Sequence, residues 1–339
     1  MTLFSKLVNA KNILITTDLE SDDCIFIDIF MKVIGKKYQK IYFLVGQGNS
    51  YMKYCRMKKY IELHKYENCE VIQGYSSKKD FILDGQDVFS EEECNQIRKV
   101  TGKEYDPDKY DYDSDKYDSD KLIEVLKTLP VIISLEPIRE LIELYTTCKD
   151  YFKYIDFVGY MGFNVRDVLD KYKFEYVTDF LKSFRSVIFY ETFHATGENS
   201  SLNNNEFPFD KLPVNINKLI TQWNTHLYNK AQKEVEKINK IPETKRSDRD
   251  KAKLYRNKKI IKANDDANML QFVNADTGLL ASLLLDLKEN EDYYQADVTF
   301  DGNYTLVKEN KESKIIVICP KDKEEFRQKQ IAFYRDFYA

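Results

Sequence analysis

Histidines and closely spaced cysteines are scarce in this chain of 339 residues. The histidines are His64, His194 and His226, so a metal site built from several imidazoles is excluded. The six cysteines lie far apart and form no Cys-x-x-Cys pair. This spacing argues against a disulfide framework and against a thiolate zinc site. Any metal ion bound by this chain would have to be held mainly by carboxylates.

An excess of one charge and long apolar runs are lacking as well. The 52 Lys and Arg residues against 56 Asp and Glu residues give a net charge of −4, so no overall basic field attracts nucleic acid or anionic lipid. No apolar run approaches the ~18 residues of a membrane-spanning helix, and residues 1–12 do not resemble a secretory signal. We therefore expect a cytoplasmic protein without nucleic-acid or membrane partners. The hydrophobic fraction of 43% is sufficient for a sizeable core.

Short β-branched segments alternate with helical segments along most of the chain. Such alternation is typical of βαβ units, so we predict an α/β fold with a mostly parallel central sheet and flanking helices. Helices are expected at Cys24–Met31 and Lys323–Tyr338, and a turn at Asp301–Asn303 between the last two strands. The predicted strands are Asn12–Thr17, Lys40–Val45, Glu70–Ile72, Val131–Ile133, Ile155–Gly159, Ser186–Tyr190, Asp297–Phe300 and Ile315–Ile318.

A low-complexity segment interrupts this alternation. Residues 103–121 repeat Tyr, Asp, Lys and Ser, and we predict a solvated acidic insertion there. Some of its aspartates are spaced like those of a calcium-binding EF-hand loop. An EF-hand is rejected, because Lys116 occupies the position of the required glycine and Leu122 that of the bidentate glutamate.

A second unusual segment, residues 231–262, is dense in charged residues and is interrupted by Pro242. It predicts two exposed helices on either side of a break. Residues 245–259 are locally basic, which would suit an anionic partner, but Asp248 and Asp250 dilute this charge. A solvated helical face is the simpler interpretation.

The most informative residues form an acidic turn after the first predicted strand. Asp18, Asp22 and Asp23 lie between that strand and the helix that follows it. In α/β sheets, ligands bind beyond the carboxyl ends of strands, so the turn lies where a site is expected. Carboxylates that converge repel one another unless a cation neutralises them, and Ca²⁺ prefers such oxygen ligands. Capping of the following helix would explain Asp22 and Asp23 equally well.

The stretch Ile13 to Cys24 resembles the signature of the nucleoside hydrolases, the inosine–uridine-preferring N-ribohydrolase family, usually written DTDPGxDDA. On that pattern Asp18, Asp22 and Asp23 match the metal-binding aspartates of the family. Asp18 also matches the residue that the family uses as general base.

Further resemblances follow along the chain in the family's order. They imply sugar contacts from Asn49, Asn164 and Glu175. They also imply a metal ligand from the main-chain carbonyl of Leu135 and a last carboxylate ligand from Asp276. The resemblance covers most of the chain, and its first motif is the most specific one.

The resemblance implies a single domain over residues 1–339 that hydrolyses the N-glycosidic bond of a ribonucleoside to free base and ribose. Its cofactor would be Ca²⁺, its partner a small-molecule nucleoside, and it could form a homo-oligomer. Asp18 would accept a proton from the attacking water. The metal ligands would be Asp18, Asp22, Asp23, Leu135 and Asp276.

Departures from the family pattern leave a second function open. Thr16 replaces the first aspartate, Leu19-Glu20 replace Pro-Gly, and Ala275 replaces a histidine that many members place as leaving-group acid. His194 and His226 are candidates for that role. The alternative is a catalytically impaired nucleoside hydrolase-like protein that binds a nucleoside or a protein partner.

Two other enzyme classes are disfavoured. A haloacid-dehalogenase-type phosphatase needs a nucleophilic aspartate at the position of Thr16. The Gly46-x-Gly48 sequence lacks the third glycine of a dinucleotide-binding loop.

Overall fold

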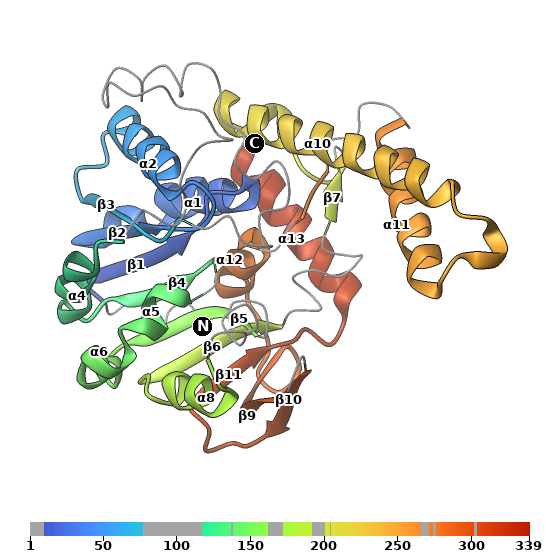
Figure 1. Cartoon of the computed structure of the whole chain (residues 1–339). Coiled ribbons are helices and arrows are strands. Elements are labelled where there is room, and N and C mark those ends of the chain that lie inside the picture. Colours follow the sequence, from blue (N-terminus) through green and yellow to red (C-terminus); the bar gives the residue numbers. More distant parts are fainter. Residues whose placement is uncertain are drawn as a thin grey trace.

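A nine-stranded sheet runs through the centre of the molecule in the order β10-β9-β11-β6-β5-β4-β1-β2-β3 (Figure 1). From β11 to β3 neighbouring strands are parallel, whereas β9 is antiparallel to both β11 and β10. This confirms the predicted α/β fold. The structure is a computed structural model that describes residues 10–76, 117–136, 138–161, 172–191, 201–203, 205–265, 271–273, 276–301 and 304–339. The strands of the large sheet are β1 (Asn12–Thr17), β2 (Lys40–Val45), β3 (Cys69–Gln73), β4 (Val131–Ser134), β5 (Asp156–Met161), β6 (Ser186–Glu191), β9 (Tyr293–Asp301), β10 (Tyr304–Glu309) and β11 (Ile315–Ile318).

Strand β1 contributes to the core on both faces of the sheet. Ile13 and Ile15 are fully buried on one face, and Leu14 is fully buried on the other. Successive side chains of a strand point to opposite faces, so a strand covered on both sides is apolar at every position. The parallel neighbours of β1 are β2 and β4.

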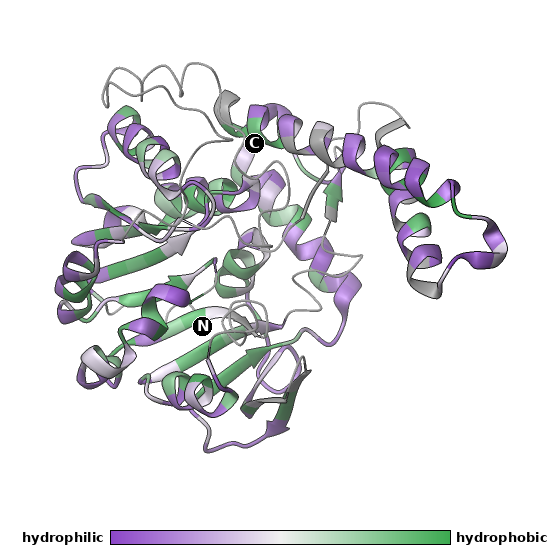
Figure 2. Ribbon diagram, viewed as in Figure 1, coloured by the Kyte–Doolittle hydropathy of each residue, from purple (hydrophilic) through white to green (hydrophobic). Residues whose placement is uncertain are grey.

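Helices cover both faces of this sheet (Figure 1). Figure 2 shows apolar strands in the middle and polar outer sides on the helices. The helices on the first face are α1 (Ser21–Val33), α2 (Ser50–His64), α10 (Val214–Asn239), α12 (Asp276–Leu284) and α13 (Lys323–Tyr338). The helices on the second face are α4 (Ser119–Lys127), α5 (Arg139–Glu143), α6 (Tyr145–Phe152) and α8 (Phe174–Lys182).

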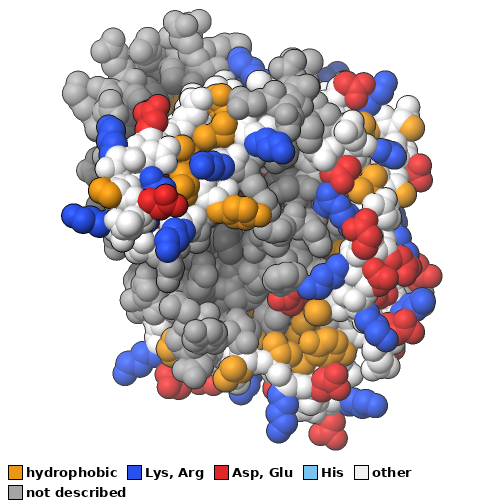
Figure 3. Space-filling model, turned by 90° about the vertical axis from the view of Figure 1, so that its right-hand side faces the viewer, with side chains coloured by type: hydrophobic (Ala, Val, Ile, Leu, Met, Phe, Trp, Pro, Cys, Tyr) orange, Lys and Arg blue, Asp and Glu red, His pale blue; other side chains and the backbone are white. Residues whose placement is uncertain are grey.

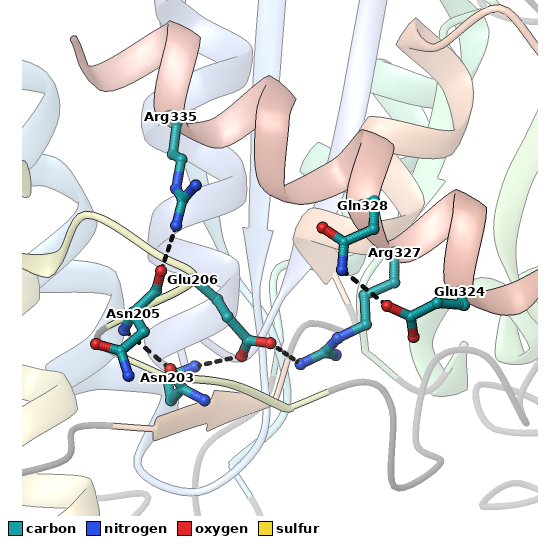
Figure 4. Close-up of polar contacts among 7 residues, drawn as sticks. All are labelled: Asn203, Asn205, Glu206, Glu324, Arg327, Gln328 and Arg335. Atoms are coloured by element: carbon teal, nitrogen blue, oxygen red, sulfur yellow. Dashed lines mark hydrogen bonds and ion pairs between the residues drawn. The ribbon is translucent and has the colours of Figure 1, made fainter.

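The C-terminal helix α13 is tied to a loop from the middle of the chain (Figure 4). Arg327 forms an ion pair with Glu206 at 2.6 Å, and Arg335 donates to the carbonyl oxygen of Asn205. The hydroxyl of Tyr338 donates to the buried carboxylate of Asp28 in α1 at 3.2 Å. The arginine contacts thus fix α13 to this loop, and the Tyr338 contact fixes the end of the chain to the first helix.

Helices α10 and α11 (Asp248–Asp265) form a hairpin that extends from the body of the molecule (Figure 1). The charged segment 231–262 lies in these two helices and in the connection around Pro242. Strands β7 (Ser201–Asn203) and β8 (Gln271–Val273) form a separate antiparallel pair. Basic and acidic side chains are interspersed on the face seen in Figure 3.

The structure differs from the sequence-based expectation in several places, and strands β7 and β8 are among the elements that were not predicted. The predicted insertion at 103–121 lies outside the described residues up to 116, but its last residues belong to α4, whose backbone is capped by Asp118. Strand β10 was not predicted, because its residues do not form an apolar run. In the described part of the chain, no helix has the length and apolar character of a membrane span.

Candidate functional site

The candidate site lies at the carboxyl ends of β1, β2 and β4. The chain order reverses between β1 and β4, since β2 pairs on one side of β1 and β4 on the other. In open α/β sheets this switch point leaves a crevice in which ligands bind. The turn from Asp18 to Glu20 leaves β1 at this point, and Glu136 follows β4. Asp18, Glu20 and Glu136 therefore lie in loops at the carboxyl ends of neighbouring strands.

The turn between β1 and α1 is held by its own polar contacts. The Thr17 hydroxyl accepts a hydrogen bond from the Leu19 N–H at 3.0 Å and donates to the Asp23 carboxylate. Leu19 has a φ of 51°, in the left-handed region that costs a non-glycine residue about 1–2 kcal/mol. Its side chain is only 4% exposed and packs in the core, which offsets this cost. The turn thus keeps a defined shape, although Leu19-Glu20 occupy the positions of Pro-Gly in the DTDPGxDDA signature that this stretch resembles.

Three carboxylates meet beside this turn. Oxygen atoms of Asp22, Asp23 and Asp276 all lie within 4.8 Å of one another. Asp22 and Asp23 lie in the first turn of α1, and Asp276 begins α12. Both helices therefore direct the positive ends of their dipoles toward the cluster, which partly offsets its negative charge. The structure thus brings Asp276, from the last quarter of the chain, to the two N-terminal aspartates.

Asp18 is buried in the same region and increases the crowding of negative charge. Burial, followed by the charge of Asp18, raises the pKa of Asp22 to about 7. Burial, followed by the charges of Asp276 and Asp18, raises the pKa of Asp23. Burial and the charges of Asp18 and Asp22 also raise the pKa of Glu20. Without added positive charge, Asp22, Asp23 and Glu20 therefore favour their protonated forms.

A second pair of buried carboxylates lies next to the first group. Glu136 and Glu140 are 1% and 4% exposed. A Cβ atom on Gly46 would come within 2.8 Å of Glu136 Oε2 and 3.0 Å of Glu140 Oε1. The backbone N–H of Tyr75 donates to Glu140 at 2.8 Å, and a Cβ on Gly74 would lie 2.8 Å from the same oxygen. The strand ends carry glycine here because the two carboxylates occupy the space of a side chain.

Helix α2 contributes an amide and a buried cation. The side-chain oxygen of Asn49, which is fully buried, accepts from the Met52 N–H at 3.0 Å and so caps the helix. One turn further, Lys53 is 1% exposed. The Lys53 ammonium partly offsets the rise in the pKa of Glu20 and Glu136.

The other residues predicted from the sequence are placed as follows. Leu135 directly follows β4 and is buried, and its N–H donates to the Thr16 carbonyl at 2.9 Å. Glu175 lies in the first turn of α8 with an exposed side chain. Of His226, the structure describes the backbone in α10 and not the side chain. Asn164, His194 and Ala275 lie outside the described residues.

Sequence reasoning missed Glu20, Glu136 and Lys53 as members of this region. The position of Glu136 directly after a buried strand was an available signal, because the carboxyl ends of parallel strands meet at one edge. Glu20 was noted only as a departure from a motif. Lys53 gave no signal, since a lysine in a helix rich in Lys and Tyr is ordinarily exposed.

Comparison with known proteins shows a fold that is already represented among solved structures. No family model matches the chain, and no curated protein matches its sequence. The structure is similar to an inosine–guanosine nucleoside hydrolase, with a TM-score of 0.52, 12% identity, and coverage of 96% of this chain and 98% of the other. It is also similar to a purine-preferring ribonucleoside hydrolase from Gardnerella vaginalis, with a TM-score of 0.50, 12% identity, and coverage of 97% and 99%. The chain therefore has the nucleoside hydrolase fold over nearly its whole length.

Proposed function

We propose that this protein hydrolyses the N-glycosidic bond of ribonucleosides to free base and ribose, with a divalent cation bound by Asp22, Asp23 and Asp276. The observation that carries the proposal is the meeting of these three carboxylates at the carboxyl end of β1, in a chain with the nucleoside hydrolase fold. We further propose Ca²⁺ as the cation.

The donor set suits a hard cation. The three side chains offer only oxygen atoms. Their ionisation is disfavoured by desolvation and mutual repulsion, and a positive charge reduces this cost. Ca²⁺ takes 6–8 oxygen ligands, so three aspartates leave positions for further groups. Asp18 and the main-chain carbonyl of Leu135 are the additional protein ligands in this proposal.

The proposed site residues have separate tasks in this scheme. A bound divalent cation would lower the pKa of water and orient the vicinal hydroxyls of the sugar. Asp18 would accept the proton of the attacking water as general base. Asn49, held rigidly as the cap of α2, would donate from its amide to a ribose hydroxyl. Asn164 and Glu175 remain predicted sugar contacts.

Departure of the base has no acid among the described side chains in this scheme, and His194 and His226 remain the candidates predicted from the sequence. Ala275 occupies the position at which many nucleoside hydrolases have a histidine that acts as leaving-group acid. A general acid typically accelerates such a step by roughly 10²–10⁴-fold. We therefore expect slow turnover of natural nucleosides and much faster turnover of 4-nitrophenyl β-D-ribofuranoside, whose leaving group needs no proton.

A screen for base release tests the proposal. The protein is incubated with inosine, guanosine, adenosine, uridine, cytidine and the 4-nitrophenyl riboside, with Ca²⁺ or with EDTA, and products are separated by chromatography. We expect release with Ca²⁺ and none with EDTA. Asp18→Asn should reduce the rate by about 100-fold or more. Asp150→Asn, which changes an aspartate that is 92% exposed, is the matched control and should keep full activity. No release from any substrate would exclude the hydrolase.

A non-catalytic nucleoside-binding protein is the second candidate. It is favoured by Glu20, which adds a half-buried carboxyl where the signature of the nucleoside hydrolases has glycine. Calorimetry with the same nucleosides distinguishes the two candidates, since calcium-dependent binding without base release would support the second one.

A further inference from the structure

The hairpin of α10 and α11 is a part of the molecule that the proposed hydrolysis does not use. Residues 231–262, which include the end of α10 and most of α11, contain twelve lysines and arginines but only five aspartates and glutamates. The remainder of the chain contains 40 basic and 51 acidic residues. The net charge of −4, which argues against a nucleic-acid partner for the chain as a whole, therefore hides a basic segment on an acidic body.

One side of α11 presents a regular row of long side chains. Lys251, Tyr255, Lys258 and Lys262 follow one another at spacings of four, three and four residues, so they lie on one face of the helix. All four side chains are exposed, and that of Tyr255 is 63% exposed. At about 1.5 Å per residue, the row extends over roughly 16 Å. We call these four residues the lysine stripe.

The apolar side of α11 is turned toward α10. Lys253 Nζ lies 4.0 Å from the Glu234 carboxylate of α10, and Leu254 and Ile261 are half-buried where the two helices pack. The lysine stripe contains none of these residues. It therefore lies on the surface of a hairpin that extends from the body of the molecule (Figure 1).

We propose that the lysine stripe binds a single-stranded nucleic acid. Lysines spaced along a line neutralise successive phosphates, and an exposed aromatic ring between them offers a face on which a base stacks. The acidic remainder of the chain repels a polyanion, which confines the contact to the hairpin. The inference does not depend on the proposed function, because the stripe shares no residue with the aspartate cluster.

Two other classes of partner fit the stripe less well. A helix that lies on a membrane inserts an apolar face, but the apolar side of α11 is turned toward α10. The centres of protein–protein interfaces are depleted in lysine, whereas three of the four stripe residues are lysines. A single-stranded nucleic acid uses both the charges and the aromatic ring of the stripe.

Fluorescence anisotropy with a labelled oligouridylate RNA of about 20 nucleotides tests the inference. EDTA is present, so that no metal-dependent activity acts on the probe. We expect a Kd of about 10 µM or tighter at low salt. The logarithm of the affinity should fall with the logarithm of the salt concentration with a slope of about −2, because each of three phosphate contacts contributes about −0.7. No binding of this RNA at low salt would overturn the inference.

Replacement of the three lysines tests whether the stripe is the binding site. The triple variant Lys251→Met, Lys258→Met, Lys262→Met should bind the RNA about 20-fold or more weakly and with a salt slope near zero, because methionine keeps the helix propensity and removes the charge. Its Tm should stay close to that of the unmutated protein, since all three side chains are exposed.

A matched control variant removes the same amount of charge from exposed positions outside the hairpin. It combines Lys36→Met, Lys37→Met and Lys127→Met. We expect this control to bind the RNA like the unmutated protein. Equal weakening in both triple variants would show that only the net charge of the protein matters, and the inference would then be wrong.

Tyr255 separates a stacking surface from a purely electrostatic one. Tyr255→Ala should weaken RNA binding about fivefold or more and leave the salt slope unchanged, because stacking of a base on the ring does not involve charge. Tyr255→Phe keeps the ring and should bind like the unmutated protein. Full affinity in the alanine variant contradicts the assignment to a single strand.

Probes of other partner classes complete the test. Vesicles of phosphatidylcholine and phosphatidylserine and a polyglutamate peptide are titrated under the same conditions, and both should bind more weakly than the RNA. Tighter binding of either probe would overturn the inference. So would an oligomer in gel filtration that the stripe variant abolishes while the RNA does not bind, because the hairpin would then contact a second copy of the chain.

Discussion

Single carboxyl groups in this protein are held in surroundings that disfavour their charge. Asp22 shows the effect in a form that can be measured, because burial and then the charge of Asp18 raise its pKa to about 7. In the metal-free protein a proton on Asp22 therefore does what a bound cation would do. A metal ion bound by the proposed site would compete with this proton for the same oxygens, so its affinity would depend on pH.

The metal-free protein should lose stability as the pH rises from about 4 to about 7. In the unfolded chain Asp22 ionises near its ordinary pKa of 3.8, whereas in the folded protein it keeps its proton up to about pH 7. The unfolded state loses its proton first, so this stabilisation is complete below pH 4 and absent above pH 7. The difference is about 2–4 kcal/mol, allowing for the partial exposure of the side chain.

Urea unfolding in EDTA at pH 4.5 and pH 8 measures this effect. Asp22→Asn should be clearly more stable relative to the unmutated protein at pH 8 than at pH 4.5, because asparagine does not ionise. The exposed Asp150→Asn should show no such pH-dependent difference. An Asp22→Asn protein with the same pH dependence as the unmutated one would show that Asp22 is not perturbed.

At the scale of elements, the ends of the strands and the starts of the helices create the site together. Strands β1, β2 and β4 end where α1, α2 and α12 begin, so buried carboxylates accumulate between strand ends and positive helix ends. Gly46, directly after β2, allows the Glu136 and Glu140 carboxylates to approach the backbone.

Gly46→Ala should destabilise the protein by about 1–3 kcal/mol, because its methyl group would lie 2.8 Å from Glu136 Oε2 in a packed region. Gly35→Ala is the matched control. Its methyl group would meet the flexible end of the Met31 side chain at 3.0 Å, which can move aside. Denaturant unfolding of both variants measures the difference, and equal effects would show that the Glu136 carboxylate moves freely.

The sequence predicted those elements whose apolar pattern is continuous. Asn12–Thr17, Lys40–Val45 and the C-terminal helix were predicted with the bounds that the structure shows. Strand β10 was missed because it is an edge strand with exposed side chains, so nothing in its pattern requires burial. An apolar pattern in the sequence thus predicts an element that is buried in the fold, and it misses an element whose side chains are exposed.

The candidate site was predictable only in part for a related reason. Asp18, Asp22 and Asp23 form a local motif, and Asp276 was found through its resemblance to a known segment. The burial of Glu136 and Lys53 depends on how α2, β4 and the turn after β1 are assembled, and no residue spacing along the chain expresses this arrangement. A buried charge is a property of the assembled molecule.

At the scale of the whole molecule, the aspartate cluster joins the first and last parts of the chain. Asp22 and Asp23 come from the first helix, and Asp276 comes from a helix that packs against α1 and α13. A cation held by all three would cross-link these distant segments in the folded state and in no other state. Ligand binding restricted to the folded state raises its stability by mass action.

Calcium should therefore raise the Tm of the whole protein. At a free concentration 100 times the Kd, the stabilisation is about 2.7 kcal/mol, which corresponds to a rise of roughly 5 °C for a chain of this size. Asp276→Asn should abolish the rise while the metal-free protein stays folded, because asparagine removes a charged ligand and also relieves the repulsion on Asp23. The exposed Asp150→Asn should keep the full rise, measured by thermal unfolding with Ca²⁺ or EDTA. A rise that persists in Asp276→Asn would mean that the cation binds without the C-terminal part of the chain, and the cluster would then not be the metal site.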